Sequence, residues 1–154
     1  MAARLKYGEL APEGMEKLRA LEHYLNTGTG LEPVLLDLVR LRVSLMNGCE
    51  YCIHLHEGEL RKLHEPEERI AGVAGWRGAG DAYTQRERAA LAWAEAVTNI
   101  QDGHAEDAVY AQMREHFSEV EAVNLTLAIT TINAWNRLAI ALGNYSGHAG
   151  AVAK

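Results

Sequence analysis

The chain has 154 residues, of which 48% are hydrophobic and 23% are charged, and its formal net charge is -6. This length and composition are typical of one globular domain with enough apolar side chains for a core, and they argue against a two-domain architecture. An acidic chain offers no basic field to a phosphate backbone, which argues against nucleic acid as a partner.

Helical periodicity dominates the sequence. Apolar residues recur at helical spacing almost everywhere, and no segment alternates apolar and polar residues over its length as a half-buried strand does. We therefore expect a single all-α domain over residues 1–154, a bundle of about six to seven helices. In chain order, the predicted helices cover residues 12–28, 33–47, 49–64, 66–73, 84–98, 105–116 and 118–143.

The predicted helix boundaries carry residues typical of helix ends: prolines in a first turn, a stop that uses a left-handed glycine, and two capping boxes. They are Pro12, Pro33, Asn47-Gly48, Thr84 with Glu87, and Ser118 with Glu121. The glycine-rich stretch Gly75–Tyr83 predicts a loop. The domain thus divides into an N-terminal helix within residues 1–30, a core at 31–143 and a loose tail at 144–154.

The last predicted helix, at 118–143, is apolar on most sides, which is typical of a buried helix. In so small a domain this burial is easier if subunits share the helix, so we expect a homo-oligomer. A single polar seam, formed by Thr126, Thr130, Asn133 and Arg137, interrupts the apolar surface. Its side chains either bond to neighbouring groups, as buried polar groups usually do, or lie beside a reactive site.

The sequence contains no evident targeting or membrane segment. Residues 1–14 mix charged with small residues and lack the apolar region of a secretory signal. The longest uncharged apolar-rich stretch, Ala122–Asn136, is shorter than the ~18 residues that span a bilayer. We therefore expect a cytoplasmic protein without a membrane partner, in a compartment where thiols are kept reduced.

Two cysteines and a histidine form the most distinctive motif, Cys49-x-x-Cys52-x-x-x-His56. On a helix these three positions fall within about 60° of one another, whereas His54 lies roughly 140° from Cys49 and is expected at the surface or in packing. Because Asn47-Gly48 ends the preceding helix, Cys49 lies in a first helical turn, where free amides stabilise a thiolate. His56, one turn after Cys52, can accept a proton from a thiol.

Asp37 is the carboxylate nearest to this motif on the N-terminal side. It precedes Arg40 by three residues, a spacing typical of a solvated ion pair. However, the segment is otherwise dense in Leu and Val, and apolar surroundings would raise the pKa of the carboxyl into a range suited to proton transfer. The residue pattern leaves both interpretations open.

The run from Asp37 to His56 resembles the active-site segment of the AhpD-like alkylhydroperoxidase and carboxymuconolactone decarboxylase superfamily, as do residues 86–96 and 131–138. The resemblance implies an AhpD-like helical bundle that forms homo-trimers or homo-hexamers. It also implies a thiol peroxidase, a peroxiredoxin-type oxidoreductase that needs no cofactor or metal. In the family pattern the second cysteine, here Cys52, attacks the peroxide, and the first, Cys49, resolves the sulfenic acid into a disulfide.

The resemblance extends to the proton relay and the partners. The family usually has a glutamate twelve residues before the first cysteine, where this chain has Asp37, so we expect a water molecule to fill the gap left by the shorter side chain. The implied catalytic set is Cys52, Cys49, His56 and Asp37. The implied partners are a hydroperoxide substrate and a dithiol electron donor, such as a lipoylated or thioredoxin-like protein.

Other interpretations of the motif remain open at this point. Two thiolates and His56 could bind zinc with one open position. Other members of the superfamily are lyases or decarboxylases acting on a lactone. A non-enzymatic protein could use the disulfide to change its assembly. For a peroxidase, an apolar pocket is expected; Leu41, Leu45 and Trp135 could line it, although all three also suit core packing.

Overall fold

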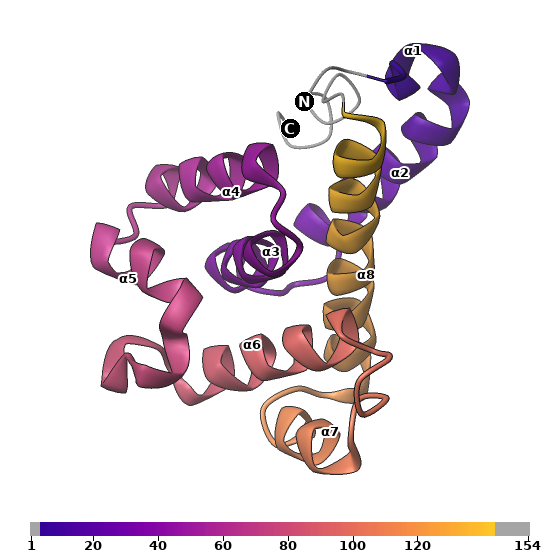
Figure 1. The fold of residues 1–154 in the computed structure, drawn as a ribbon. Coiled ribbons are helices and arrows are strands. Elements are labelled where there is room, and N and C mark those ends of the chain that lie inside the picture. Colours follow the sequence, from indigo (N-terminus) through magenta and orange to yellow (C-terminus); the bar gives the residue numbers. More distant parts are fainter. Residues whose placement is uncertain (1–3, 144–154) are drawn as a thin grey trace.

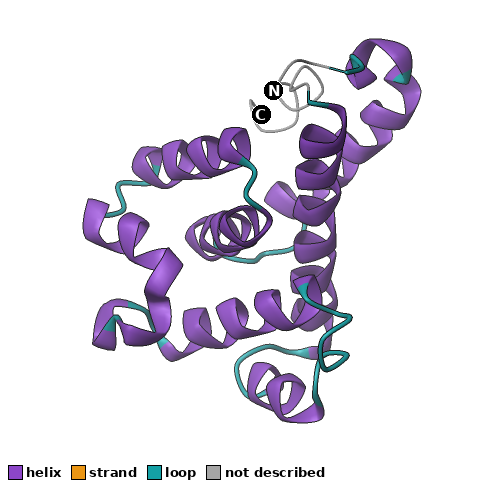
Figure 2. Cartoon of the chain, in the orientation of Figure 1, coloured by secondary structure: helices purple, strands orange, loops and turns teal. Residues whose placement is uncertain are grey.

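The computed structural model describes residues 4–143 of the chain, so the predicted tail at 144–154 lies outside the described residues. Within the described range the chain forms eight α-helices and two 3₁₀ helices and no strand, which confirms the all-α prediction (Figure 2). The count exceeds the predicted six to seven because of α1 (Tyr7–Leu10), whose four residues are too few to show a period in the sequence.

The remaining helices agree with the predicted segments, mostly within one or two residues at each end. They are α2 (Pro12–Thr27), α3 (Pro33–Asn47), α4 (Glu50–Lys62), α5 (Glu67–Ala71), α6 (Gln85–Thr98), α7 (Asp107–Arg114) and α8 (Glu119–Leu142). The 3₁₀ helices η1 (Gly72–Gly78) and η2 (Gly80–Ala82) lie between α5 and α6. Both capping boxes are present, at Thr84 with Glu87 and at Ser118 with Glu121. None of the described helices is long and apolar enough to cross a membrane.

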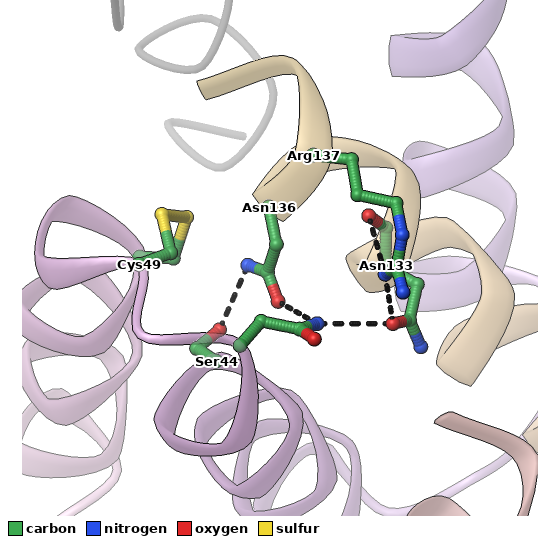
Figure 3. The surroundings of a disulfide bond; sticks show 7 residues. Ser44, Cys49, Asn133, Asn136 and Arg137 are labelled. Atoms are coloured by element: carbon green, nitrogen blue, oxygen red, sulfur yellow. Dashed lines mark hydrogen bonds between the residues drawn. A yellow bond between two sulfur atoms is a disulfide. The ribbon is translucent and has the colours of Figure 1, made fainter. Parts of the chain in front are cut away.

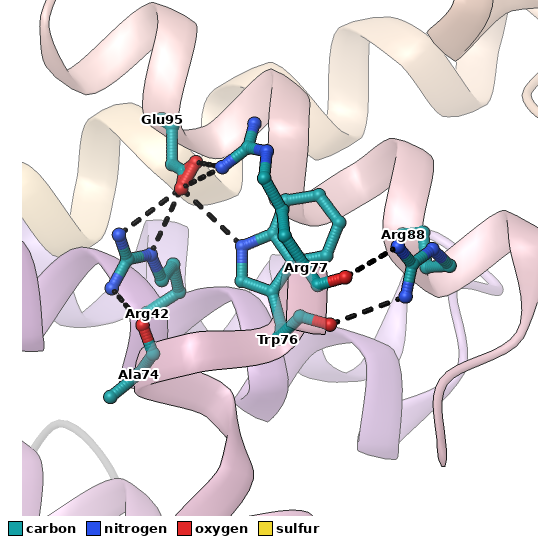
Figure 4. A network of polar contacts seen from close by, with 6 residues as sticks. All are labelled: Arg42, Ala74, Trp76, Arg77, Arg88 and Glu95. Atoms are coloured by element: carbon teal, nitrogen blue, oxygen red, sulfur yellow. Dashed lines mark hydrogen bonds and ion pairs between the residues drawn. The ribbon is translucent and has the colours of Figure 1, made fainter. Parts of the chain in front are cut away.

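The prediction of a loop at Gly75–Tyr83 is wrong, because η1 and η2 occupy most of this stretch. The buried Trp76 anchors it: the indole nitrogen donates to Glu95 of α6 at 3.3 Å, and Glu95 also accepts from Arg42 of α3 at 3.1 Å and from Arg77 (Figure 4). The guanidinium of Arg88 donates to the main-chain carbonyls of Trp76 and Arg77, each at 3.2 Å. These contacts stabilise a compact turn that glycine content alone does not reveal.

Helix α3 lies at the centre of the fold, where α4, α6 and α8 pack around it (Figure 1). The larger core cluster joins α2, α3, α6, α7 and α8, and a second one lies among α3, α4, α5, η1 and α6. Ten of the 24 residues of α8 are buried, fewer than its apolar sequence predicts, and Val120 and Val123 near its start are 70% and 61% exposed. The first half of α3 also lines a surface pocket together with α2 and α4.

Candidate active site

A glycine in the left-handed conformation separates α3 from the cysteine motif. Gly48 ends α3 with φ 71° and ψ 31°, a conformation that glycine adopts without a steric penalty. The amide of the next residue, Cys49, donates to the carbonyl of Ser44 at 3.1 Å, which closes the helix end. The chain turns here, and Cys49 becomes the N-cap of α4 rather than a residue of its first turn. The helix therefore begins one residue later than predicted.

The two cysteines form a disulfide bond with a Cα–Cα distance of 5.3 Å. Cys49 is 1% exposed and Cys52 is fully buried. Ala139 of α8 is buried with the two sulfurs in a small apolar cluster, and the half-buried Tyr51 packs against it. The disulfide therefore lies between the start of α4 and the last turns of α8, in surroundings that suit a neutral molecule better than an ion.

Asp37 and His56 form a buried pair that bridges α3 and α4. His56 is 1% exposed, and its Nδ1 lies 3.1 Å from Oδ1 of Asp37. The expected bridging water is therefore a wrong prediction, because α3 and α4 pack closely enough for the shorter aspartate to reach the imidazole directly. His54, on the same helix, is exposed as predicted.

The electrostatics of Asp37 differ from both sequence-based interpretations. Its ion pair with Arg40, at 3.3 Å, is buried rather than solvated. Burial alone raises the pKa of the Asp37 carboxyl, but the hydrogen bond with His56 and the positive charge of Arg40 outweigh it, so the pKa lies below its ordinary value. The interpretation with a raised pKa is therefore wrong: Asp37 is an ionised hydrogen-bond acceptor, not a proton donor.

An ionised Asp37 also defines the tautomer of His56. In a neutral imidazole only one nitrogen carries a proton, and Nδ1 must carry it to donate to the carboxylate. Nε2 is then unprotonated. It is buried and has no hydrogen-bond partner among residues 4–143. His56 follows Cys52 by one helical turn, so the imidazole and the cysteine share one face of α4.

Arg40 extends the cluster toward α2, a feature that the sequence reasoning missed. Its Nη2 lies 2.8 Å from the carboxylate of Glu22 and donates to the amide oxygen of Asn26 at 2.7 Å. Asp37 and Arg40 border a surface pocket of about 230 Å³ between α2, α3 and α4. The only available signal was Glu22 itself, a carboxylate beside the apolar stripe of Leu18, Leu21 and Leu25.

Carboxamide side chains of α8 hold the end of α3 beside the disulfide (Figure 3). The fully buried Asn136 donates to the hydroxyl of Ser44 at 3.1 Å and accepts from Asn47 at 3.0 Å. Asn47 also donates to Asn133 at 3.0 Å, and Asn133 accepts from Arg137. Asn133 of the predicted polar seam thus reaches the segment before the cysteines.

The rest of the seam and the expected pocket lining have structural roles. Thr126 and Thr130 each donate to a main-chain carbonyl of α8, as the packing interpretation predicts. Leu41 and Leu45 pack in the cluster between α3 and η1, and Trp135 packs in the main core, so none of the three belongs to the apolar cluster of the cysteines. Within the described range, no three His, Cys, Asp or Glu side chains are grouped so that they could hold a metal ion.

Comparison with known proteins decides the family. The profile of the Carboxymuconolactone decarboxylase family matches residues 12–96, a range that includes α2, Asp37 and the whole cysteine motif. The chain belongs to this family. The chain is also similar to two uncharacterized proteins. YdfG of Bacillus subtilis (strain 168) is 40% identical over 94% of this chain and 97% of YdfG. YnjA of Escherichia coli (strain K12) is 28% identical over 64% of this chain and 53% of YnjA.

Solved structures share the fold. A protein of unknown function from Agrobacterium tumefaciens, described as a candidate antioxidant defence protein AhpD, is 38% identical and superposes with a TM-score of 0.88 over 93% of this chain and 97% of its own. The debrominase Bmp8 superposes with a TM-score of 0.77 over 93% of this chain and 77% of its own, at 20% identity. The fold of this family member is therefore the AhpD-like helical fold.

Proposed function

We propose that this protein is a thiol-dependent peroxidase, a peroxiredoxin-type oxidoreductase that reduces hydroperoxides through a Cys49–Cys52 dithiol/disulfide cycle. The observation that carries the proposal is the buried Asp37–His56 pair, in which Nε2 of the imidazole has no hydrogen-bond partner among residues 4–143 and His56 lies one helical turn after a cysteine already in a disulfide. Membership of the family and the likeness to a candidate AhpD protein support it.

The first step is proton transfer from a thiol. In the reduced protein Cys52 carries an S–H group, and Nε2 of His56 is the base that takes its proton. The charge that develops on the imidazole is stabilised by ionised Asp37 at 3.1 Å, as a carboxylate stabilises an imidazolium in a hydrolase triad. Removal of the proton creates the thiolate, which is the reactive nucleophile.

The next two steps transfer oxygen and form the disulfide. The Cys52 thiolate attacks the outer oxygen of ROOH, the O–O bond breaks, and the departing alkoxide takes the proton from His56 to leave as ROH. Cys52 becomes a sulfenic acid. The thiol of Cys49 then displaces hydroxide, which leaves as water with the thiol proton, and the S–S bond forms. The 5.3 Å between the two Cα atoms is within the range for this bond.

Completion of the cycle requires a dithiol donor, because the disulfide must gain two electrons and two protons. We propose that a lipoylated or thioredoxin-like protein supplies them through a mixed disulfide. Asp37 borders the pocket between α2, α3 and α4, which brings solvent to the carboxylate side of the Asp37–His56 pair. We also propose a cytoplasmic homo-oligomer, a trimer or hexamer, in which the exposed Val120 and Val123 are covered.

A single-turnover thiol titration tests the proposal. Reduced protein receives one equivalent of cumene hydroperoxide, and free thiols are counted over time. We expect the native protein to lose both thiols. The remaining thiol of Cys52→Ser should be lost no faster than the thiols of free dithiothreitol. Cys49→Ser should accumulate a Cys52 sulfenic acid that dimedone traps. If the native protein reacts no faster than free dithiothreitol, the peroxidase proposal is wrong.

A matched pair of histidine variants isolates the base. His56→Asn removes the imidazole while leaving an amide that can still bond to Asp37, and it should slow thiol loss by about 10²-fold or more. His54→Asn changes a side chain that is 81% exposed on the same helix and should leave the rate unchanged. Equal rates for the two variants would remove His56 from the mechanism.

The family name favours a second candidate function, a lyase or decarboxylase that acts on a lactone. Thiol alkylation separates the two candidates. Iodoacetamide treatment of the reduced protein should abolish peroxide reduction because it blocks Cys52. Lactone turnover that survives alkylation would instead support the lyase.

A further inference from the structure

The buried charges do not end at the Asp37–His56 pair. Arg40, itself 3% exposed, lies 3.3 Å from Asp37 through Nη1 and 2.8 Å from Glu22 through Nη2. Asn26 accepts a further hydrogen bond from the same guanidinium at 2.7 Å. Glu22 and Asn26 both lie on α2 and bond to Arg40, which in turn contacts Asp37. The proposed mechanism uses neither of them.

These contacts form one chain of charges through three helices. It runs from Glu22 on α2 through Arg40 and Asp37 on α3 to His56 on α4. Glu22 and Arg40 are each only 3% exposed, so solvent screens them weakly and a change of one charge acts over the whole chain. The single cation between two anions leaves the group with one net negative charge beside the imidazole.

We propose that Glu22 and Arg40 are positioning residues that set the pH range in which the Asp37–His56 pair accepts the proton of Cys52, with Asn26 orienting the guanidinium. They touch neither substrate nor sulfur and act through Asp37. The inference rests on the proposed role of Cys52 as the reacting thiol. It makes α2, which the cysteine motif does not include, a functional part of the site.

Two further charged pairs lie near the pocket and on α3. On α4, Lys62 contacts Glu59 at 2.7 Å at the rim of the pocket, and the lysine side chain is 72% exposed. On another face of α3, Arg42 contacts Glu95 of α6 at 3.1 Å. Arg42 follows Arg40 by two residues, which turns it about 200° around the helix axis. Lys62, whose ammonium group is exposed and screened by solvent, supplies the control.

The sign of the effect follows from charge alone. Glu22→Gln removes a negative charge and takes the net charge of Glu22, Arg40 and Asp37 from minus one to zero, so a proton at the dyad or at Cys52 is held less tightly. Arg40→Gln takes it to minus two, and protons are held more tightly. The acid limb is the pH range in which the reactivity of Cys52 falls as the thiol becomes protonated. It should move to lower pH in Glu22→Gln and to higher pH in Arg40→Gln, each by about one pH unit.

The test measures alkylation of Cys52 by iodoacetamide against pH, in reduced protein carrying Cys49→Ser so that only one thiol reports. Opposite shifts for Glu22→Gln and Arg40→Gln, with no shift for Lys62→Gln, support the inference. Arg40→Lys keeps the charge, so its acid limb should stay near that of the Cys49→Ser parent. Limbs that do not move, or that move in the same direction, overturn it.

The test does not depend on the folding of every variant or on peroxide turnover. If Arg40→Gln does not fold, as judged by its circular dichroism spectrum, Glu22→Gln and Arg40→Lys still give a predicted shift and a predicted absence of shift. Alkylation needs no peroxide, so it is independent of the proposed activity. Opposite shifts in a protein that ignores peroxide would reject the peroxidase and retain the inference, and unmoved limbs in an active peroxidase would do the reverse.

Discussion

Two glycine-to-alanine substitutions, only ten positions apart, should have opposite effects on stability. Gly48 has a left-handed backbone with φ 71°, whereas Gly58 lies inside α4 and is not among the residues with positive φ. An added Cβ would meet no atom within 4 Å at either position. Steric clashes therefore contribute nothing, and the two effects isolate backbone conformation.

The expected magnitudes follow from that difference. An L-residue in the left-handed region costs about 1–2 kcal/mol, so Gly48→Ala should lower the melting temperature by roughly 3–6 °C in a domain of this size. Gly58→Ala removes a flexible residue from a helix interior and should stabilise by about 0.5–1 kcal/mol, a rise of roughly 1–4 °C. Gly48→Asn should fall between Gly48→Ala and the native protein, because asparagine tolerates the left-handed region.

Thermal unfolding monitored at 222 nm, with a urea titration for the free energy, measures both effects on oxidised protein. The reasoning predicts a difference in sign between the two alanine variants, not merely in size. A Gly48→Ala protein as stable as Gly58→Ala would show that the chain does not need a left-handed residue before Cys49, and the account of how α3 ends would be wrong.

Three further predictions concern the site. Because the folded-state pKa of Asp37 is lowered, its charge stabilises the fold above about pH 4, and this contribution is lost as the pH falls further. The difference in free energy of unfolding between the native protein and Asp37→Asn should therefore be constant from about pH 5 to 8 and shrink in acid. The control Asp81→Asn changes an exposed carboxylate and should differ little from the native protein at any pH. Reducing the Cys49–Cys52 disulfide, which closes a very short loop, should lower the free energy of unfolding by no more than about 2 kcal/mol in urea titrations, so both redox forms stay folded. Asn136→Leu leaves the hydroxyl of a buried serine and an asparagine amide short of a partner and should lower the urea midpoint by an amount equivalent to about 2 kcal/mol, with an unchanged m value.

Much of the fold follows from local signals along the chain. Pro12 and Pro33 start helices, Gly48 ends one, and two capping boxes place α6 and α8, because each device works within one helical turn. The segment after Gly72 escaped this reasoning. Its turns are held by Arg88 and Glu95, which lie on another helix, and no local pattern records such contacts.

The site shows the same division between local and long-range information. The spacing of Cys49, Cys52 and His56 is a property of one helix and could be read directly. The direct contact of Asp37 with His56 depends on how closely α3 approaches α4, and the wrongly expected water reflects that missing distance. Arg40 was visible only as a helical neighbour of Asp37, since its bond to α2 joins segments that sequence spacing does not relate.

The second-order rate constant for the reduced protein with hydrogen peroxide, measured by stopped flow at pH 7, tests the central claim most directly. A positioned base contributes about 10²–10⁴-fold, so Cys52 beside His56 should react at least about 100 times faster than a thiol of free dithiothreitol under the same conditions. One disulfide should form for each peroxide consumed. A rate constant equal to that of dithiothreitol, with the disulfide forming no faster than in solution, would contradict the account.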